Sequence, residues 1–448
     1  MQNYLIRNIA VVNEGQTTVQ DVWIRNERIE KIAPQINING QYTEINGEGK
    51  HLLPGVIDDQ VHFREPGLTH KASIYTEARA AVAGGVTSFM EMPNTRPPAV
   101  TQQKLEEKYD LGRQHSLANY SFFMGVTNDN VEEVLQTNAK KDRVCGIKIF
   151  MGSSTGNMLV DNYLTLEKLF SESELLIATH CEDEKIIRNN MARFLEEKGE
   201  AHLTAADHPL IRNEEACFES SLVAVQFAQK HHSRLHILHI STEKELRLFS
   251  NMLPLAEKRI TAEVCVHHLY FTADDYVRYG NLIKCNPAIK ADHNKHALWQ
   301  GLLDDRLDII ATDHAPHTWE EKQQPYLQAP SGVPLVQHSL LMMLEHVSKG
   351  NITLEKMVEK MCHAPAVCFR IRERGYLREG YYADCVIADL QQATTVVKEH
   401  VYYKCNWSPF EEHTFPAAIT HTFVNGHPAW QNGLFNESKQ GQRLLFSC

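Results

Sequence analysis

The chain has 448 residues, of which 43% are hydrophobic and 23% charged, and these proportions are ordinary for a globular protein. With 45 lysine and arginine residues against 56 aspartate and glutamate residues, the formal net charge is −11. That balance argues against a nucleic-acid partner or an anionic-membrane surface, because no excess of positive charge is available to neutralise phosphates. The first residues, "MQNYLIRNIAVVNEG", carry no signal-peptide pattern, and no apolar run approaches the ~20 residues that span a bilayer.

The ten cysteines are scattered and include no C-x-x-C pair. Several of them fall inside apolar, strand-like runs, so we interpret them as small buried hydrophobic residues rather than as disulfides or a zinc ribbon. We therefore expect a cytoplasmic protein.

Short β-strands are predicted at both ends of the chain. "YLIRNIAVV" and "DVWIRNERIEKIA" alternate near the N-terminus, and "GYLREGYYADCVIADL" and "AITHTFVNGHPAW" follow after about residue 365. Asn425-Gly426 lies between two alternating runs and is a strong hairpin signal. We expect residues 1–53 and 366–448 to pair into one small β-sandwich, beside a domain formed by residues 54–365.

Eight short apolar runs, separated by charged segments of helix length, fill that central region. They are "GVIDDQVHF", "VTSFMEMPN", "NYSFFMGVT", "VCGIKIFMG", "ELLIATHCED", "RLHILHIST", "ITAEVCVHH" and "LDIIATDHAPH". Strands that alternate with helices indicate a parallel sheet, and eight such units fit a (β/α)8 TIM barrel.

Polar and ionisable residues gather at or near the ends of these predicted strands. They are His62, Asn94, Lys148, His180, His239, His267 and Asp313. A closed barrel brings the carboxyl ends of its strands together, whereas an open sheet spreads them out, so we favour the barrel over a doubly wound sheet.

Lys148 lies inside the apolar run "CGIKIFMG". Burial penalises its charge, and two arrangements would relieve this. A carboxylate could neutralise the ammonium group. Alternatively, a lowered pKa would leave a neutral amine that reacts with carbon dioxide, giving a carbamate that can bridge two cations.

The other strand-end residues favour the second arrangement. His180 and His239 end successive strands, and with His62, Lys148 and Asp313 they offer nitrogen and oxygen donors suited to zinc. A lone buried histidine is more often a core residue, but matching positions on several strands indicate a ligand set. Asp313 can ligate a metal and carry a proton from water to a leaving nitrogen, or it can simply cap a helix.

Gln60 is the residue that does not fit this pattern. Asp58, Gln60 and His62 alternate along one predicted strand and so project from one face. A hydrolytic metal site would use histidine at both of the last two positions. Here glutamine occupies the first of them.

A longer series of motifs runs in order from about residue 50 to 340. It comprises "LPGVIDDQVHFREPG", "MEMPNT", "IKIFMGSSTGN", "ATHCED", "LHIST", "CNPAIK", "IATDHAPHTWEEK" and "APSGVP". The series resembles the dihydroorotases of the amidohydrolase superfamily, of the class I type found in multifunctional complexes. "REPG", "MPNT" and "TDHAPH" are specific, and the C-terminal "GYLREGYYADCVIADL" resembles the sandwich segment of this family, so the resemblance covers nearly the whole chain.

The resemblance implies a binuclear zinc centre. His62 would be the second histidine of the first-strand pair, and Lys148 would be the carbamylated bridge. His180 and His239 would hold the second metal, while Asp313 would serve as ligand and proton shuttle.

The resemblance also implies substrate contacts. Arg64 and Asn94 would hold a carboxylate, since a guanidinium group matches it with two parallel hydrogen bonds, although Arg64 could instead pair with Glu65. Asn286 and His317 would contact a pyrimidine ring. His268 is expected to be structural, and the segment from about 317 to 332 is long enough to act as a lid.

The implied reaction is the reversible cyclisation of N-carbamoyl-L-aspartate to L-dihydroorotate in pyrimidine biosynthesis, by a homodimeric enzyme. Because the family has histidine where Gln60 stands, we expect one firm zinc and a second that is weaker or absent, unless glutamine only hydrogen-bonds a metal-bound water. Two alternatives stay open. One is another cyclic amidohydrolase, such as a hydantoinase or allantoinase, and the other is a catalytically silent partner of aspartate transcarbamoylase.

Overall fold

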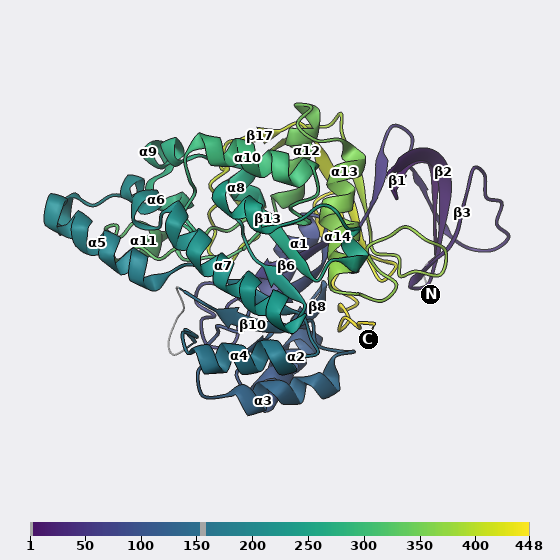
Figure 1. Ribbon diagram of the computed structural model, residues 1–448. Coiled ribbons are helices and arrows are strands. Elements are labelled where there is room, and N and C mark those ends of the chain that lie inside the picture. Colours follow the sequence, from purple (N-terminus) through teal and green to yellow (C-terminus); the bar gives the residue numbers. More distant parts are fainter. Residues whose placement is uncertain (1–2, 153–157, 448) are drawn as a thin grey trace.

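A computed structural model describes residues 3–152 and 158–447 of the chain (Figure 1). The last part of the "IKIFMGSSTGN" motif, residues 153–157, lies outside the described residues. Helices and strands alternate through the centre of the chain, and strands dominate both of its ends. The predicted α/β class is confirmed.

Each of the eight predicted central runs contains a strand. They are β6 (Val56–Val61), β7 (Val86–Glu91), β8 (Asn119–Phe122) with β9 (Met124–Gly125), β10 (Ile147–Phe150), β11 (Ile177–His180), β12 (Leu235–Ile237), β13 (Ile260–Cys265) and β14 (Ile309–Ala311). Hydrogen-bonded neighbours among them run parallel, in the orders β6-β7-β8 and β9-β10-β11-β12-β13-β14.

These two groups of strands are joined at both ends. Phe123 alone separates β8 from β9, and its N–H donates to Glu91 O of β7 at 3.1 Å. Val61, at the end of β6, forms a parallel bridge with His314, whose carbonyl also accepts from His62 N at 2.7 Å. The path of strands therefore returns from β14 to β6, and the carboxyl ends of the strands face the same side.

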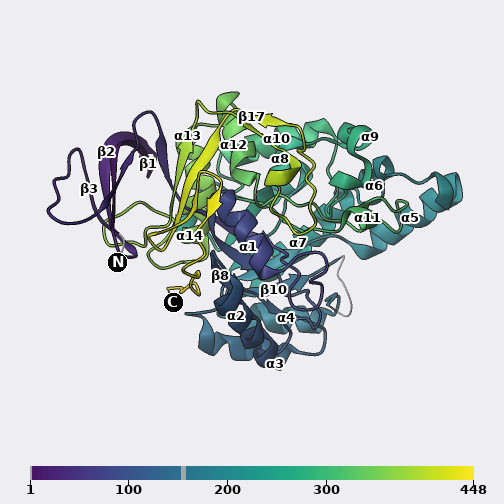
Figure 2. The same ribbon diagram turned by 180° about the vertical axis from the view of Figure 1, so that it is seen from behind.

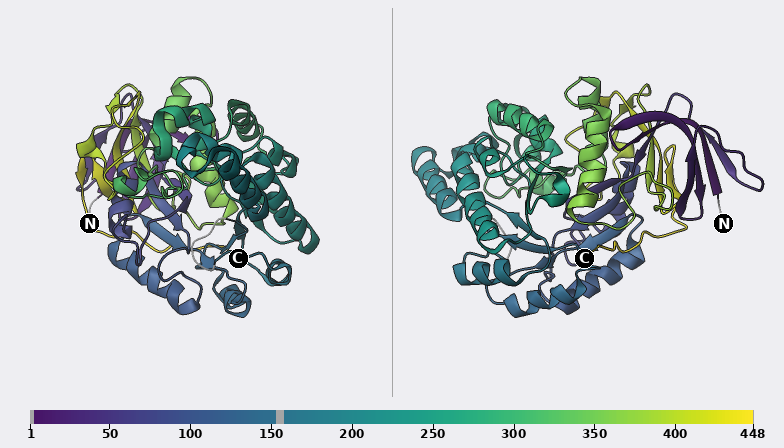
Figure 3. Two further views of the ribbon diagram at one scale, coloured as in Figure 1. Left: turned by 90° about the vertical axis from the view of Figure 1, so that its left-hand side faces the viewer. Right: turned by 45° about the vertical axis from the view of Figure 1, so that its right-hand side comes forward.

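Helices lie outside this ring of strands (Figures 1 to 3). The longer ones are α1 (Ile74–Ala83), α2 (Gln102–His115), α4 (Tyr163–Glu172), α5 (Glu184–Lys198), α7 (Glu214–His231), α10 (Asp292–Leu303) and α12 (Ser339–Ser348). Short ones are α3 (Val131–Leu135), α6 (His208–Ile211), α8 (Val266–Tyr270), α9 (Tyr276–Tyr279), α11 (Trp319–Lys322), α13 (Leu354–Val358) and α14 (Ala364–Cys368). Ser73, Thr101 and Asp183 cap α1, α2 and α5 through their side-chain oxygens, which satisfies backbone N–H groups that would otherwise lack partners.

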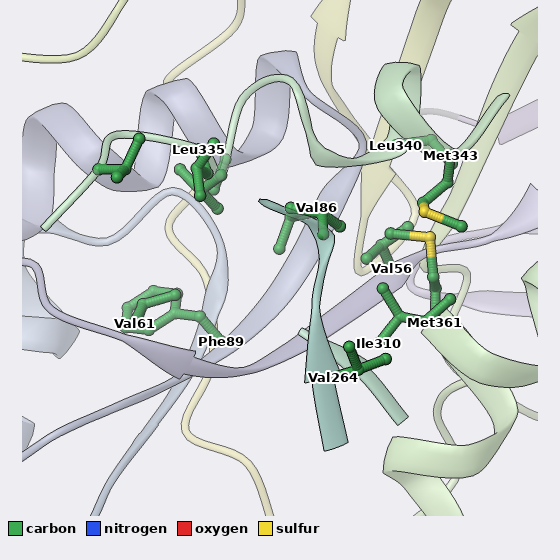
Figure 4. Close-up of a cluster of buried hydrophobic side chains, with 14 of the residues drawn as sticks. Val56, Val61, Val86, Phe89, Val264, Ile310, Leu335, Leu340, Met343 and Met361 are labelled. Atoms are coloured by element: carbon green, nitrogen blue, oxygen red, sulfur yellow. The ribbon is translucent and has the colours of Figure 1, made fainter. Parts of the chain in front are cut away.

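The main core lies between the strands and the helices. Figure 4 shows Leu340 and Met343 of α12 beside each other, and Ile310 of β14 near Met361. All four side chains are at most 1% exposed. Burial of each such side chain stabilises the fold by about 1.5–3 kcal/mol, so the apolar strand residues fix the helices while polar residues remain available for the interior.

Strands from the two ends of the chain share one sheet. Its strands follow the order β20-β19-β18-β15-β5-β1-β2-β3, with β4 beside β1. They are β1 (Asn3–Asn13), β2 (Gln16–Arg25), β3 (Arg28–Ala33), β4 (Thr43–Asn46), β5 (His51–Pro54), β15 (Cys385–Asp389), β18 (Ala418–Val424), β19 (His427–Gln431) and β20 (Leu434–Phe435). The short strands β16 (Thr394–Thr395) and β17 (Thr414–Phe415) pair separately.

The junction of the two ends is β5 against β15, where Leu52 pairs with Ile387. In Figures 1 and 2 the purple β1–β3 stand beside the yellow C-terminal strands. Tyr4 and Phe423, which lie on non-adjacent strands β1 and β18, bring their rings to 5.3 Å, so the sheet curls around its own core. The predicted hairpin at Asn425-Gly426 is confirmed, because both residues have positive φ angles and lie between β18 and β19.

Two expectations about composition can be compared with this fold. The cysteines among the described residues are all free and buried, in agreement with their interpretation as hydrophobic residues. In the described part of the chain, no helix is long and apolar enough to cross a membrane.

Candidate metal centre

A cavity of about 280 Å³ lies at the carboxyl ends of the parallel strands. It brings together every residue that the sequence analysis proposed as a ligand or a substrate contact. These are His62, Arg64, Asn94, Lys148, His180, His239, Asn286, Asp313 and His317, with Gln60 among them. The lining also includes Phe150, Ala315, Pro330, Ser331 and Gly332.

His62 follows β6 directly and contacts two side chains from neighbouring strand ends. Its Nδ1 lies 2.9 Å from Asn94 Oδ1 and its Nε2 lies 3.0 Å from Asp313 Oδ1. An amide oxygen can only accept a hydrogen bond, so His62 Nδ1–H donates to Asn94 Oδ1, and in the neutral ring the lone pair of Nε2 points at the Asp313 carboxylate. Two electron-pair donors that face each other at this distance are suited to sharing a cation.

His180 ends β11, and His239 follows β12 by two residues. His180 Nδ1 lies 2.9 Å from His239 Nε2. Tetrahedral zinc, with Zn–N distances of 2.0–2.1 Å, holds two ligating nitrogens about 3.3 Å apart, so the pair needs little movement to bind an ion. Burial and the neighbouring His180 and Lys148 lower the pKa of His239 well below its usual range, which keeps the ring in the neutral form that a metal requires.

Glu182 supports His180 from behind. Its Oε2 lies 3.1 Å from His180 Nε2 and accepts from Arg212 Nη1 at 2.5 Å, while its side chain is fully buried. Burial alone would raise the pKa of Glu182, but Arg212 and His180 outweigh it and lower the pKa to about 2. A carboxylate on the far nitrogen of a ligand histidine is a common support in metal sites.

Lys148 is 1% exposed, on strand β10. Burial lowers its pKa to about 7. In the described part of the chain its ammonium group has no ion-pair partner, and Nζ lies 4.6 Å from the centre of the Phe150 ring. The carboxylate-pairing alternative thus has no partner among these residues, and a substantial neutral fraction of the amine is available near pH 7.

Gln60 is buried in β6 and makes two side-chain contacts. Its Nε2 donates to Asp313 Oδ1 at 3.1 Å, and its Oε1 lies 3.7 Å from Cys265 Sγ. The amide therefore turns its N–H toward Asp313 and its oxygen toward β13. In this position Gln60 orients Asp313 rather than replacing the expected histidine ligand.

Arg64 is only 7% exposed and lines the cavity. Its Nε donates to Pro316 O at 3.2 Å, and burial lowers its pKa to about 10. Among the described residues no carboxylate pairs with it, and the suggested pairing with Glu65 is wrong because Glu65 accepts instead from Ile74 N at 2.8 Å. A buried guanidinium group without an anion faces the cavity.

The remaining predicted contacts come from two loops. Asn286 Oδ1 lies 3.0 Å from His208 Nε2, which orients the Asn286 amide. His317 Nδ1 lies 2.9 Å from Lys71 Nζ, and its Nε2 lies 2.9 Å from Ser331 O. Arg64 Nη2 lies 3.1 Å from the same Nε2, so a donor-only cation faces each ring nitrogen of His317.

Lys322, in the segment from His317 to Gly332, has a role that sequence reasoning missed. It is 1% exposed, and its Nζ donates to the carbonyl oxygens of Lys284, Pro330 and Gly332 at 3.1, 3.0 and 2.9 Å. Lys284 Nζ in turn donates to Tyr326 O and Ala329 O, each at 2.6 Å. Two buried lysines thus fix the backbone that lines one side of the cavity.

A buried network beneath the ligands was also missed. His236 Nε2 lies 3.3 Å from Asp59 Oδ2 and 3.1 Å from Glu263 Oε2, and Glu263 Oε1 accepts from His239 N at 3.1 Å. The sequence does contain a feature that could have indicated this network. Glu263 is a charged residue inside the apolar run "ITAEVCV", just as Lys148 is a charged residue inside its own apolar run.

Comparison with known proteins identifies the family of the chain. Residues 51–429 match the Amidohydrolase family over most of the chain. The chain belongs to the amidohydrolase family. The resemblance that the motifs suggested is therefore confirmed.

Two relatives within this family are similar over nearly their whole length. A protein named dihydroorotase from Methanosarcina acetivorans is 32% identical over 97% of this chain and 94% of its own length. Another dihydroorotase, from Listeria innocua, is 30% identical over 96% of this chain and 99% of its own.

Solved structures of a hydantoinase and a dihydropyrimidinase share the fold. The L-hydantoinase from Arthrobacter aurescens superposes with a TM-score of 0.93 at 25% identity, covering 99% of this chain and all of its own. A dihydropyrimidinase from Brevibacillus agri superposes with a TM-score of 0.88 at 22% identity, over the whole of both chains.

Proposed function

We propose that the chain is a zinc-dependent dihydroorotase, which catalyses the reversible cyclisation of N-carbamoyl-L-aspartate to L-dihydroorotate in cytoplasmic pyrimidine biosynthesis. The observation that carries the proposal is the cavity that joins a metal-type donor set to the unpaired, buried Arg64. The full-length similarity to proteins named dihydroorotase supports the same reaction.

The fold that supports this reaction is a (β/α)8 barrel over residues 54–365, with a β-sandwich made from residues 1–53 and 366–448. The returning path of parallel strands and the pairing of β5 with β15 support this division. Barrel enzymes of this kind act at the carboxyl ends of the strands, where the cavity lies.

The donor atoms present fit zinc. His62, a carbamylated Lys148 and Asp313 would hold one ion, and the carbamate with His180 and His239 would hold the other. Bound zinc would lower the pKa of water and polarise the ring carbonyl. The ion beside His62 should bind more weakly than the other, because Gln60 stands where the family has a histidine ligand. Gln60 turns its N–H toward Asp313, and an N–H group cannot bind a cation.

In the hydrolytic direction, water adds to the ring carbonyl carbon, and the bond from this carbon to the ring nitrogen breaks. Asp313 accepts the proton of the water and delivers it to the departing nitrogen. Gln60 keeps the Asp313 carboxylate in place by donating to Oδ1. The synthetic direction uses the same proton transfer in reverse.

The substrate carboxylate would bind Arg64 and Asn94, and the ring would contact Asn286, His317 and the backbone near Gly332. A guanidinium group buried without an anion gains strongly from a carboxylate, because a charge-assisted pair replaces an unpaired charge. The two lysine-fixed carbonyl groups keep the backbone side of the cavity ready for the ring.

The structural likeness to hydantoinases favours a second candidate, a cyclic amidase whose substrate lacks the carboxylate. Arg64 distinguishes the two, since a hydantoin ring offers it no anion. We disfavour a catalytically silent partner of aspartate transcarbamoylase. In a protein that no longer uses its site, mutations would be expected to replace several of the metal ligands, whereas the proposed ligands of this chain line one cavity. Association with that enzyme, and a homodimer, remain part of the proposal.

The deciding experiment is dihydroorotate turnover by the purified protein, measured after chelator treatment and again after zinc is restored. Zinc-dependent turnover in both directions is expected, with hydantoin and dihydrouracil as much poorer substrates. A folded, zinc-loaded protein that hydrolyses hydantoin but leaves dihydroorotate unchanged would move the assignment to the cyclic amidases.

A further inference from the structure

Three potential ligands that the proposed mechanism does not use lie together at the end of β13. Cys265 is the last residue of that strand, and His267 and His268 follow in α8. All three side chains are buried, and one ligand atom from each lies within 4.8 Å of the others. We propose that Cys265, His267 and His268 form a zinc site, here called the β13 site, separate from the residues that would hold the catalytic ions.

The histidine nitrogens point to a ligand. The side chain of His267 is 1% exposed, and its ring nitrogens lack a well-formed hydrogen bond among the described residues, with the backbone of Thr312 as their nearest polar neighbour. His268 Nε2 donates to Pro287 O at 3.1 Å, so Nδ1 carries a lone pair, and that atom is buried without a partner in the same part of the chain. A buried polar atom without a partner costs about 1–3 kcal/mol, and a backbone carbonyl on the far N–H is the usual support of a metal-binding histidine.

The donor set selects the kind of metal. One sulfur and two imidazole nitrogens are soft to intermediate donors, and zinc prefers such sets in a tetrahedral arrangement. Calcium or magnesium would need oxygen ligands instead. A closed, fully buried position is characteristic of a structural zinc ion rather than of one that keeps a place for substrate.

Gln60 supplies the fourth ligand. Its Oε1 lies 3.7 Å from Cys265 Sγ. In a tetrahedral zinc site with Zn–S near 2.3 Å and Zn–O of 2.0–2.2 Å, sulfur and oxygen ligands stand about 3.6 Å apart. The amide of Gln60 would then serve two sites at once, since its oxygen faces Cys265 while its N–H holds Asp313.

The surroundings of Cys265 also favour a cation. The carboxyl groups of Glu263 and Asp313 lie near its thiol. A divalent ion offsets this negative charge and deprotonates a coordinating thiol, so that binding forms a zinc–sulfur bond and releases the thiol proton to solvent.

Titration of the metal-free, full-length protein with cobalt(II) tests the β13 site. Cobalt bound to a thiolate absorbs in the near ultraviolet by charge transfer from sulfur, whereas cobalt bound only by nitrogen and oxygen lacks this band. The band is expected to saturate at one equivalent per chain. Cys265→Ser should abolish it and lower the zinc content by one equivalent, while Cys181→Ser, which removes another buried thiol next to His180, should keep both.

His268→Gln gives a second test in which the thiol is retained. The variant should bind cobalt at the β13 site about tenfold or more weakly, because loss of a ligand reduces metal affinity by at least that much. The charge-transfer band should still appear at saturating cobalt, because Cys265 is present. Cobalt-loaded wild-type protein without the band, a band that survives Cys265→Ser, or unchanged affinity in His268→Gln would each overturn the β13 site.

Turnover of dihydroorotate by the same samples is read separately. A protein that shows the band but no turnover retains the β13 site and loses the proposed function. A protein that turns over dihydroorotate without the band retains the function and loses the site.

Discussion

Gln60 Nε2 donates a hydrogen bond of 3.1 Å to Asp313 Oδ1, the same oxygen that lies 3.0 Å from His62 Nε2. The glutamine therefore occupies the place of a ligand but acts on another ligand. It holds the carboxylate that would carry the proton, and it leaves the metal position beside His62 one donor short.

Gln60→His should strengthen that position. An imidazole adds a strong zinc donor beside His62, so we expect the zinc concentration that half-activates dihydroorotate turnover to fall by more than about tenfold, since even weaker changes around a metal shift affinity that much. The zinc dependence of turnover measures this. Gln60→Met is the control, because methionine keeps the length of the side chain but adds no imidazole. Activation of Gln60→Met at equally low zinc concentrations would contradict the explanation.

Arg64→Met should separate the two candidate enzymes. Loss of a buried partner of a carboxylate costs about 2–5 kcal/mol, so kcat/KM for dihydroorotate should fall by about 30-fold to several thousandfold. Any hydrolysis of dihydrouracil, which has no carboxylate, should change far less. Arg113→Met, which removes an exposed arginine, serves as the control. Equal losses on both substrates would show that Arg64 does not bind the carboxylate.

Some of this site could be predicted because the chemistry is visible in the residue types. A lysine in an apolar strand and histidines at successive strand ends violate the usual pattern of a core, and such violations gather where the strands converge. Lys148, His180 and His239 were found in this way. The alternating runs of the fold were equally visible, because helix and strand periods differ.

Other parts depend on distances between segments far apart in the chain. Gln60 and Asp313 are 253 residues apart, and no local pattern says which end of the amide faces the carboxylate. The same holds for the three carbonyl groups around Lys322, because any buried backbone carbonyl accepts a hydrogen bond equally well whatever its side chain. Pairing between the two ends of the chain was predicted, but neither the junction of β5 with β15 nor the strand order around it was.

Lys322→Met should loosen the segment that runs from His317 to Gly332. The change removes a buried donor from three carbonyl groups, and hydrogen bonds to charged groups contribute about 1.5–3 kcal/mol each. We expect faster proteolysis between residues 317 and 332 and a KM for dihydroorotate raised by about tenfold or more. Lys104→Met, which removes an exposed lysine of α2, should leave both unchanged. An unchanged KM in Lys322→Met would mean that the segment keeps its position without this lysine.

His338 should make the stability of the protein depend on pH. The ring is 3% exposed, and its Nδ1 lies 3.2 Å from Ser408 Oγ and 3.3 Å from Tyr403 Oη. Burial lowers its pKa to about 3, whereas the unfolded chain would protonate it near its ordinary value of 6.5. Its contribution is therefore fully present above pH 6.5 and is lost as the pH falls toward 3, because the unfolded state then binds the extra proton.

The expected slope for this one group is up to about 1.4 kcal/mol per pH unit within that window. Urea denaturation of the wild-type protein and of His338→Asn at pH 7 and pH 5 measures it. The asparagine oxygen can still accept from Ser408 but does not titrate, so the variant should lose less stability between the two pH values than the wild-type protein does. Parallel losses in both proteins would assign the pH dependence to other buried histidines, such as His346, whose pKa burial lowers to about 4.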